Sequence, residues 1–282
     1  INADEFIKRN KRVRTLYYWT HTAPAVGGAY PVNNFASYTL LGGAASAAGG
    51  ATPNNSIQVG QGFYVSSLDA FTVEFNNEMR RDAIASTQFF RSTTTESNEK
   101  HRIWLNLNAS SHPVNQILLG YMNGATNNVD SSIDGLTLED SNSKLYNLIN
   151  DRAYVIQGRA LPFTNEDIVP LGFMANVSDT FTISLENFDG LFTNQDIYLK
   201  DNLTNVIHDL KAGNYQFTSQ AGVFNNRFEI VYRNTTLDTQ EFENTSTISV
   251  FANQNGIHVI ASSFIKEIII YDVLGKVVLH SK

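Results

Sequence analysis

The sequence predicts an all-β protein whose main part is a large antiparallel β-sandwich of the jelly-roll kind. Its 282 residues include 18 Phe and 12 Tyr, interspersed with Asn, Gly, Ser and Thr. Aromatic and β-branched residues favour strands, whereas Asn and Gly favour tight turns. Short segments of alternating apolar and polar residues recur about every 10–20 residues, a spacing typical of sandwiches and jelly rolls. Apolar residues make up 42% of the chain, which is enough to fill a core and excludes a disordered chain.

Strands are expected where alternation with period two lies between turn residues. In chain order they cover residues 14–20, 60–65, 70–75, 102–107, 116–121, 154–159, 169–173, 180–185, 196–201, 214–218 and 227–232. Pro170 lacks a backbone N–H group, so its strand is expected at a sheet edge.

Few segments favour a helix. Residues 2–10 are expected to form one or two helical turns with Asn2 as the N-cap, and residues 143–150 to form another short helix. Residues 42–51 consist almost entirely of Gly, Ala and Ser, which predicts a flexible surface loop.

A polar segment without alternation divides the chain. Residues 234–247 have the composition of a linker, which gives a sandwich domain over 1–233 and a second strand set over 248–282. Within the second set, Ile268–Tyr271 is expected to be a buried strand, followed by a turn at Asp272–Gly275 and a return strand from Lys276 to Leu279. The Gly275 backbone is expected to need a positive φ.

Composition excludes several functional classes. The net charge is −7 and the pI about 5.3, so no broad basic surface exists for nucleic acid. The chain has no Cys, which excludes disulfides, thiolate zinc sites and thiol nucleophiles. No apolar run reaches the roughly 18–20 residues of a membrane helix. The chain starts at Ile1 within a polar segment, and we expect it to be part of a longer protein.

No motif for catalysis is evident, so we expect this chain not to be an enzyme. The six histidines lack metal-ligand spacing, and Gly-x-Ser-x-Gly is absent. Acidic residues gather in the segment that contains Asp130, Asp134, Glu139 and Asp140, which could supply oxygen ligands to a structural calcium ion or form a solvated loop. We expect no other cofactor.

The C-terminal residues resemble the core of a type IX secretion C-terminal sorting domain. The resemblance lies in the apolar run 268–270 followed by Tyr271-Asp272, two residues, Gly275, Lys276 and Val277. Its motif residues are Ile268, Ile270, Tyr271, Asp272, Gly275, Lys276 and Val277. A complete sorting domain of this kind is a small Ig-like sandwich with further strands, so residues 248–282 correspond to its first part, a truncated domain.

The preceding residues are similar to the region found upstream of such sorting domains in large surface proteins of gliding Gram-negative bacteria. The matching segments include 18–21, 60–63, 75–80, 102–107, 156–159, 169–172, 197–201 and 226–228. The resemblance implies a cargo that is secreted or attached to the cell surface. It also implies two partners, the type IX translocon and the outer-membrane shuttle barrel.

Two functions are therefore expected. The first is a non-catalytic C-terminal region that directs export and presentation at the cell surface. The alternative is a glycan-binding adhesin module in which strand aromatics such as Tyr17, Trp19 and Trp104 stack on polysaccharide. These three aromatics could equally belong to the core.

Overall fold

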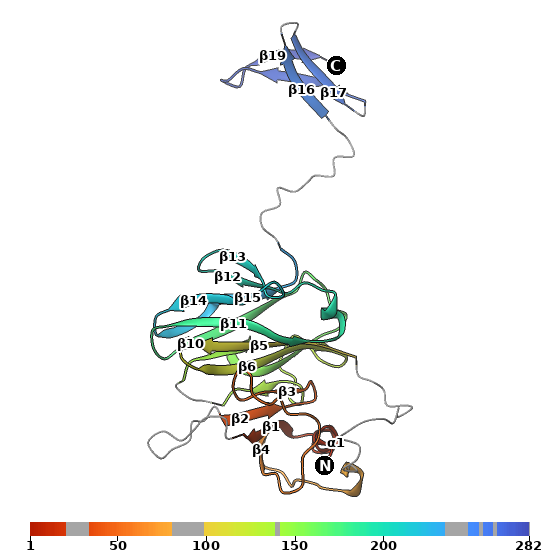
Figure 1. Cartoon of the computed structure of the whole chain (residues 1–282). Coiled ribbons are helices and arrows are strands. Elements are labelled where there is room, and N and C mark those ends of the chain that lie inside the picture. Colours follow the sequence, from red (N-terminus) through yellow and green to blue (C-terminus); the bar gives the residue numbers. More distant parts are fainter. Residues whose placement is uncertain are drawn as a thin grey trace. The chain divides into compact units, whose positions relative to one another are not determined.

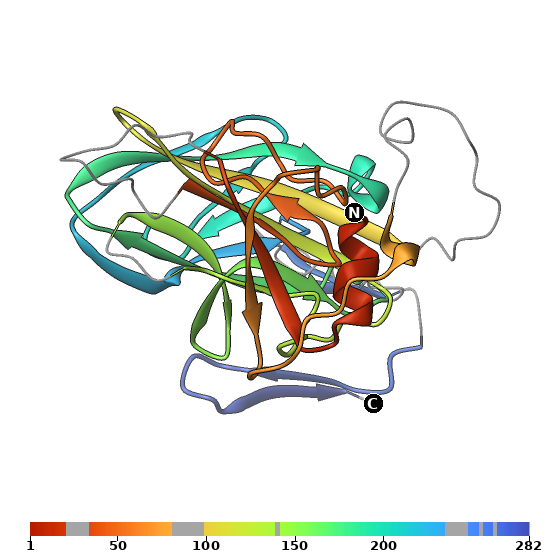
Figure 2. The same cartoon turned by 90° about the horizontal axis from the view of Figure 1, so that it is seen from below.

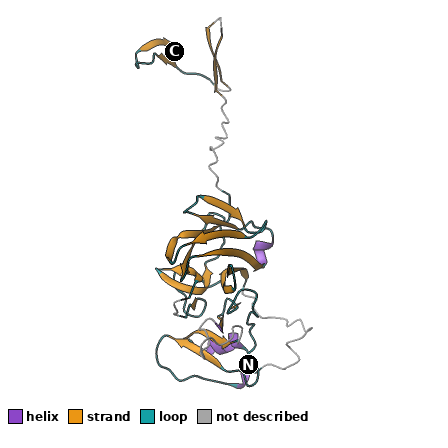
Figure 3. Ribbon diagram, turned by 60° about the vertical axis from the view of Figure 1, so that its left-hand side comes forward, coloured by secondary structure: helices purple, strands orange, loops and turns teal. Residues whose placement is uncertain are grey.

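A computed structural model describes residues 1–20, 34–80, 99–138, 142–234, 248–253, 256–261 and 264–281. The chain forms two compact units, Ile1–Asn234 and Thr235–Lys282. Strands dominate both units and the helices are short (Figure 3), which confirms the predicted all-β class. The predicted linker 234–247, apart from Asn234, lies outside the described residues, as do His21, Glu139 and Asp140. In the described part of the chain, no helix has the length and apolar character needed to cross a membrane.

The first unit begins with helix α1 (Ala3–Arg9), whose N-cap is Asn2 as predicted. The Asn2 Oδ1 atom accepts hydrogen bonds from the N–H groups of Asp4 and Glu5, which would otherwise have no partner at the helix start. The apolar side chains of α1 pack on a four-stranded sheet in the order β3-β2-β1-β4 (Figure 2). Its strands are β1 (Val13–Trp19), β2 (Phe35–Tyr38), β3 (Gly43–Ala44) and β4 (Phe63–Ser67).

The second sheet of this unit has 11 strands in the order β13-β12-β15-β10-β8-β9-β6-β5-β11-β14, with β7 paired to β9. Its strands are β5 (Lys100–Ala109), β6 (Pro113–Met122), β7 (Gly135–Leu136), β8 (Lys144–Ile149), β9 (Arg152–Arg159), β10 (Ile168–Ala175), β11 (Asp179–Phe188), β12 (Tyr198–Asp201), β13 (Val206–Asp209), β14 (Tyr215–Ser219) and β15 (Gly222–Val231). The pairing is antiparallel except between β6 and β9, which run parallel. Two 3-10 turns, η2 (Asn77–Met79) and η4 (Gly190–Thr193), complete the unit.

Figure 1 shows the strands of the large sheet, from β13 at one end of the strand order to β14 at the other. The sheet folds back on itself, and aromatic side chains fill the space that it encloses. The ring centroid of Phe173 on β10 lies 5.0 Å from that of Phe181 on β11 and 5.2 Å from that of Phe217 on β14. These rings meet although β10 and β11 are far apart in the strand order. Phe217 also contacts Phe228 on β15 edge to face at 4.8 Å. The two ends of one sheet therefore act as the two layers of a sandwich.

Strands β5 and β6 are buried on both faces. Ile103 and Leu105 point into the aromatic core, while Trp104 packs with Leu118 and Leu41 on the outer face. The predicted flexible loop at 42–51 is wrong because its first part, Gly42–Ser46, is buried against these strands. The Trp104 Nε1–H group donates to the Gly43 carbonyl at 2.8 Å. Small residues are needed here because they let the backbone approach the sheet closely.

Three further predictions are wrong for tertiary reasons. Residues 143–150 form strand β8 rather than a helix, because β10 and β9 supply backbone partners on both of its sides. Residues 70–75 alternate but form no strand, because the buried Asn10 side chain pairs with both the N–H and the carbonyl of Glu74. Pro170 lies in the central strand β10. At Pro170 this strand pairs with β15 only, because the pairing of β10 with β8 begins one residue later, at Leu171.

The second unit contains two separate two-stranded sheets. One is formed by β16 (Ile248–Asn253) and β17 (Gly256–Ala261), and the other by β18 (Ile268–Tyr271) and β19 (Val277–Ser281). Both are antiparallel hairpins.

Gly43→Ala should destabilise the first unit strongly. A Cβ atom at Gly43 would lie 2.1 Å from the Pro53 carbonyl oxygen, a backbone atom that cannot move aside alone. We expect a loss of about 2–4 kcal/mol in the free energy of unfolding, measured by urea titration. Gly62→Ala is the matched control, because a Cβ atom at that position would have nothing within 4 Å. Equal stability of the two variants would contradict the close packing of this segment.

Candidate functional site

The residues of the predicted sorting motif come together in one hairpin, β18–β19. The Asp272 side chain organises its turn, since its Oδ1 atom accepts hydrogen bonds from the N–H groups of Leu274 and Lys276, both at 2.9 Å. The Gly275 N–H group donates to the Asp272 carbonyl at 3.0 Å, and Gly275 has the positive φ that the sequence predicted, 81°. Asp272 and Gly275 thus fix the turn, whereas the apolar motif residues form the two strands.

Apolar side chains of this unit are exposed to an unusual degree. Tyr271 is 57% exposed, Leu274 is 89% exposed and Phe264 is 94% exposed. Among the side chains of this unit that the structure describes, none is buried. The prediction of a buried strand at Ile268–Tyr271 is therefore wrong, because a two-stranded sheet has no second layer to cover its faces. Within that strand, Ile268 and Ile270 are half-buried and the other two residues are exposed.

Both hairpins also have open strand edges. In the described part of the unit, β16 pairs only with β17, and β18 only with β19. The outer edge of each strand carries backbone N–H and carbonyl groups that another strand could pair with. One contact links the two arms of the second hairpin at its open end, where His280 Nε2 lies 2.6 Å from Glu267 Oε1. Open edges and exposed apolar faces are the features of a surface that acquires a partner by strand addition.

The calcium candidates Asp130 and Asp134 lie together in a turn of the first unit. Asp134 is buried and accepts hydrogen bonds from the N–H groups of Gly158, at 2.8 Å, and Asp130, at 2.6 Å. The Asp130 carboxylate accepts from the N–H and the hydroxyl of Thr126. Both carboxylates therefore satisfy local donors, and Asp134 holds the loop against β9. In the part of the chain that the structure describes, no three His, Asp or Glu side chains are grouped to hold a metal ion.

Burial dominates the electrostatics of Asp134. It raises the pKa of Asp134 to about 7, even though the two N–H donors favour the ionised form and act in the opposite direction. Several other acidic side chains of this unit pair with arginines instead, and Asp189 and Asp201 are two examples. Asp189 pairs with Arg102, and the fully buried Asp201 pairs with Arg227 at 3.0 Å. For Asp201, burial raises the pKa, but the hydrogen bonds that it accepts, above all from Arg227, outweigh burial and lower the pKa overall.

The three candidate stacking aromatics have separate environments. Trp104 is a core residue, and Tyr17 is buried with its hydroxyl group donating to the Leu136 carbonyl at 2.9 Å. Trp19 is half-buried and contacts Phe35 edge to face at 4.9 Å. Sequence reasoning missed Phe35 and Tyr64, which lie on strands next to β1. Only the pairing register, which joins Tyr17 to Tyr64 and Trp19 to Phe35, brings them together.

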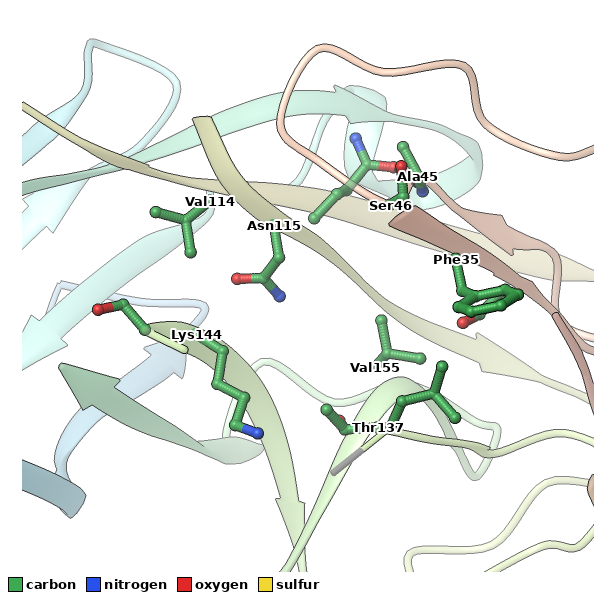
Figure 4. Close-up of a pocket in the computed structure, with 12 residues that line it drawn as sticks. Phe35, Ala45, Ser46, Val114, Asn115, Thr137, Lys144 and Val155 are labelled. Atoms are coloured by element: carbon green, nitrogen blue, oxygen red, sulfur yellow. Dashed lines mark hydrogen bonds between the residues drawn. The ribbon is translucent and has the colours of Figure 1, made fainter. Parts of the chain in front are cut away.

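A cleft lies between the small sheet and the large sheet of the first unit. Figure 4 shows Phe35, Ala45 and Ser46 on the side of the small sheet, and Asn115, Lys144 and Val155 on strands of the large sheet. Two of the polar side chains at this end are engaged in hydrogen bonds within the large sheet. Asn115 exchanges hydrogen bonds with the backbone of Leu145, and the Gln116 Nε2–H group donates to Asn106 Oδ1 at 2.9 Å. This cleft therefore joins the two sheets, and Phe35, Thr137 and Leu138 also line a second pocket beside β4.

Gly275→Val should disturb the β18–β19 hairpin. Val at a φ of 81° is strained by its branched side chain, and we expect a cost of about 1–3 kcal/mol. The measurement is the loss of cross-strand backbone contacts between residues 268–271 and 277–281 by NMR. Gly275→Asn is the control, because Asn tolerates a left-handed backbone. Loss of the contacts in both variants, or in neither, would contradict the assigned role of Gly275.

Asp134 should make the first unit less stable as the pH rises. The pKa is about 7 in the folded chain and 3.8 in the reference state, so between these values the folded chain binds one more proton. The contribution of Asp134 to the free energy of unfolding is therefore largest below about pH 4 and falls by on the order of 2–4 kcal/mol as the pH rises to 7. Urea titrations at pH 4.5 and 8 should show a smaller fall in Asp134→Asn than in the wild type.

The exposed Asp151 provides the control for this experiment. Asp151→Asn should keep the pH dependence of the wild type. A second arm adds calcium chloride at pH 8. A calcium-dependent rise in the unfolding midpoint that is lost in Asp134→Asn would show that this carboxylate holds a cation and not only local N–H groups.

Comparisons with known proteins identify one family. A family model described as a domain of unknown function (DUF8693) matches residues 1–232, which is nearly all of the first unit. No curated protein and no solved structure matches the chain. Since the model covers well over half of the 282 residues, the chain belongs to the DUF8693 family.

Proposed function

We propose that this chain is the C-terminal region of a type IX secretion cargo and that residues 248–282 direct its export. The observation that carries this proposal is the structure of the hairpin that contains Tyr271–Gly275, with its ordered turn and its exposed strands. Its motif residues lie in a turn ordered by Asp272, between strands with free edges and exposed apolar side chains. A folded unit normally buries such groups, so a surface of this kind favours a role in recognition.

The expected recognition is strand addition. A partner strand would pair with the open edge of β18 or β19, while apolar pockets of the partner would take up side chains such as Tyr271 and Leu274. The expected partners are the type IX translocon and the outer-membrane shuttle barrel. Residues 248–282 would contribute strands to a small Ig-like sandwich of the sorting-domain kind. The protein would be secreted or attached to the cell surface, and gliding motility is one process in which such surface proteins act.

We assign no catalytic role to this region. Its buried charged groups support a structural role, because Asp167 and Asp201 each pair with an arginine, at 2.6 and 3.0 Å respectively. Such pairs hold strands and loops in register, and removing one partner leaves an unpaired buried charge.

A second candidate function is glycan binding by the first unit, as in an adhesin. The observation that favours it is the solvent-exposed aromatic side chain of Tyr64 beside Phe35 and Trp19 on one face of the small sheet. Exposed aromatic platforms on sheets are suited to stacking against sugar rings.

The export proposal is tested with a secreted reporter in a bacterium that has the type IX system. A reporter joined to the whole chain should reach the cell surface, and one joined to residues 1–247 should stay in the periplasm. Asp272→Ala should reduce display, because it removes the acceptor of two turn hydrogen bonds, whereas Asp151→Asn should leave it unchanged. Equal surface display with and without residues 248–282 would refute the targeting role.

A further inference from the structure

The small sheet of the first unit has one covered face and one partly open face. Side chains alternate between the faces of a strand, and directly paired residues share a face. Leu16, Tyr18 and Phe63 lie on the face that packs against α1. Tyr17 pairs with Tyr64 and with Ser37, so these three lie on the opposite face, which α1 does not cover.

Three aromatic rings form a row on this opposite face. Trp19 contacts Phe35 at 4.9 Å and Phe35 contacts Tyr64 at 5.5 Å, in both cases edge to face. Phe35 is half-buried, and Tyr64 is 68% exposed. The contacts hold each ring in place before any ligand arrives, so little side-chain entropy would be lost on binding.

A groove of about 590 Å³ runs along the part of this row that Phe35 and Tyr64 form. Its other wall comes from the segment Leu136–Leu138, which begins at the last residue of β7 in the large sheet. The hydrogen bond from the Tyr17 hydroxyl to the Leu136 carbonyl fixes this wall. The volume lies within the range of about 300–1,000 Å³ that is usual for ligand sites. Because both walls belong to one compact unit, the groove is a built feature of the fold.

The side chains that line the groove are uncharged. It combines the rings of Phe35 and Tyr64 with aliphatic side chains and the hydroxyl groups of Ser66 and Thr137. The described residues that line it include no Asp, Glu, Lys or Arg. The Thr137 hydroxyl has no hydrogen-bond partner within the described part of the protein, although it is shielded from solvent. A buried hydroxyl without a partner is costly, and a ligand hydroxyl could satisfy it after a small adjustment.

We propose that this groove binds a neutral oligosaccharide, with a sugar ring stacked on Tyr64 and sugar hydroxyls bonded to Ser66 and Thr137. A pyranose ring offers an apolar C–H face and a rim of hydroxyl groups without charge, which matches the lining. An anionic polymer would need cationic partners, which the described lining does not supply. The inference rests on the second candidate function, glycan binding, and assigns it a site and a ligand class.

The test uses the whole chain and isothermal titration calorimetry. The probes are cellohexaose, laminarihexaose, xylohexaose and mannohexaose, with oligogalacturonate as the anionic comparison. At least one neutral probe should bind. Tyr64→Ala should weaken that binding by about tenfold or more, because the stacking surface is lost. Tyr64→Phe should retain it, since the ring remains.

The matched control is Tyr271→Ala. Tyr271 is exposed to a similar degree, 57%, but lies in the other unit, so its loss should leave the affinity unchanged. Unchanged thermal unfolding of Tyr64→Ala separates loss of binding from loss of folding. Thr137→Val, which removes the hydroxyl and keeps the shape, should weaken binding by about threefold or more.

The outcomes separate the site from the function. If no neutral or anionic probe binds the wild type, both the glycan-binding function and this inference are overturned. If a probe binds and Tyr64→Ala and Thr137→Val leave the affinity unchanged, glycan binding survives but this groove is not its site. If only oligogalacturonate binds, the assignment of a neutral ligand is wrong.

Discussion

The fold of the first unit depends on strands β5 and β6 being buried on both faces. A strand that is buried on both faces needs apolar side chains packed against each face. The inner cover is the aromatic core around Phe173, which forms only because the large sheet folds back on itself. The outer cover is supplied by Leu41, which precedes β3, and by Gly43 at the start of β3. Both lie against the face of β5 and β6 that carries Trp104 and Leu118. Removing either cover would expose the same two strands, so the two sheets of this unit depend on one another.

The aromatic groove follows from this arrangement. The small sheet meets the large one through β3 and the 41–46 segment, and its other face is covered by α1. Part of the face that contains Tyr17 therefore turns toward the segment after β7 without being fully covered. The hydrogen bond from Tyr17 to Leu136 fixes the distance between the two walls. A site of this kind is formed by two sheets in contact and does not depend on a catalytic motif.

The two units differ in how far they bury their apolar side chains. The first buries large side chains in three clusters and pairs its interior charges, as in the contact of Asp167 with Arg159 and Tyr121. The second leaves Tyr271, Leu274 and Phe264 exposed. Isolated two-stranded hairpins are marginally stable in water. This contrast is the physical basis for proposing that the second unit acts through a partner, whereas the first unit buries a core of its own.

Local alternation and turn chemistry are enough to predict the strand class, most strand positions, the Asn2 cap and the positive φ of Gly275, because each of these depends on neighbouring residues in the chain. Tertiary structure decided the segments whose local signal was ambiguous. Residues 144–149 became a strand because two neighbours offered backbone partners, and residues 42–46 were buried because Trp104 required a cover. The row of Trp19, Phe35 and Tyr64 likewise depends on strand register. Residues on three different strands meet only when pairing places them on one face, and a single sequence carries no signal for that pairing.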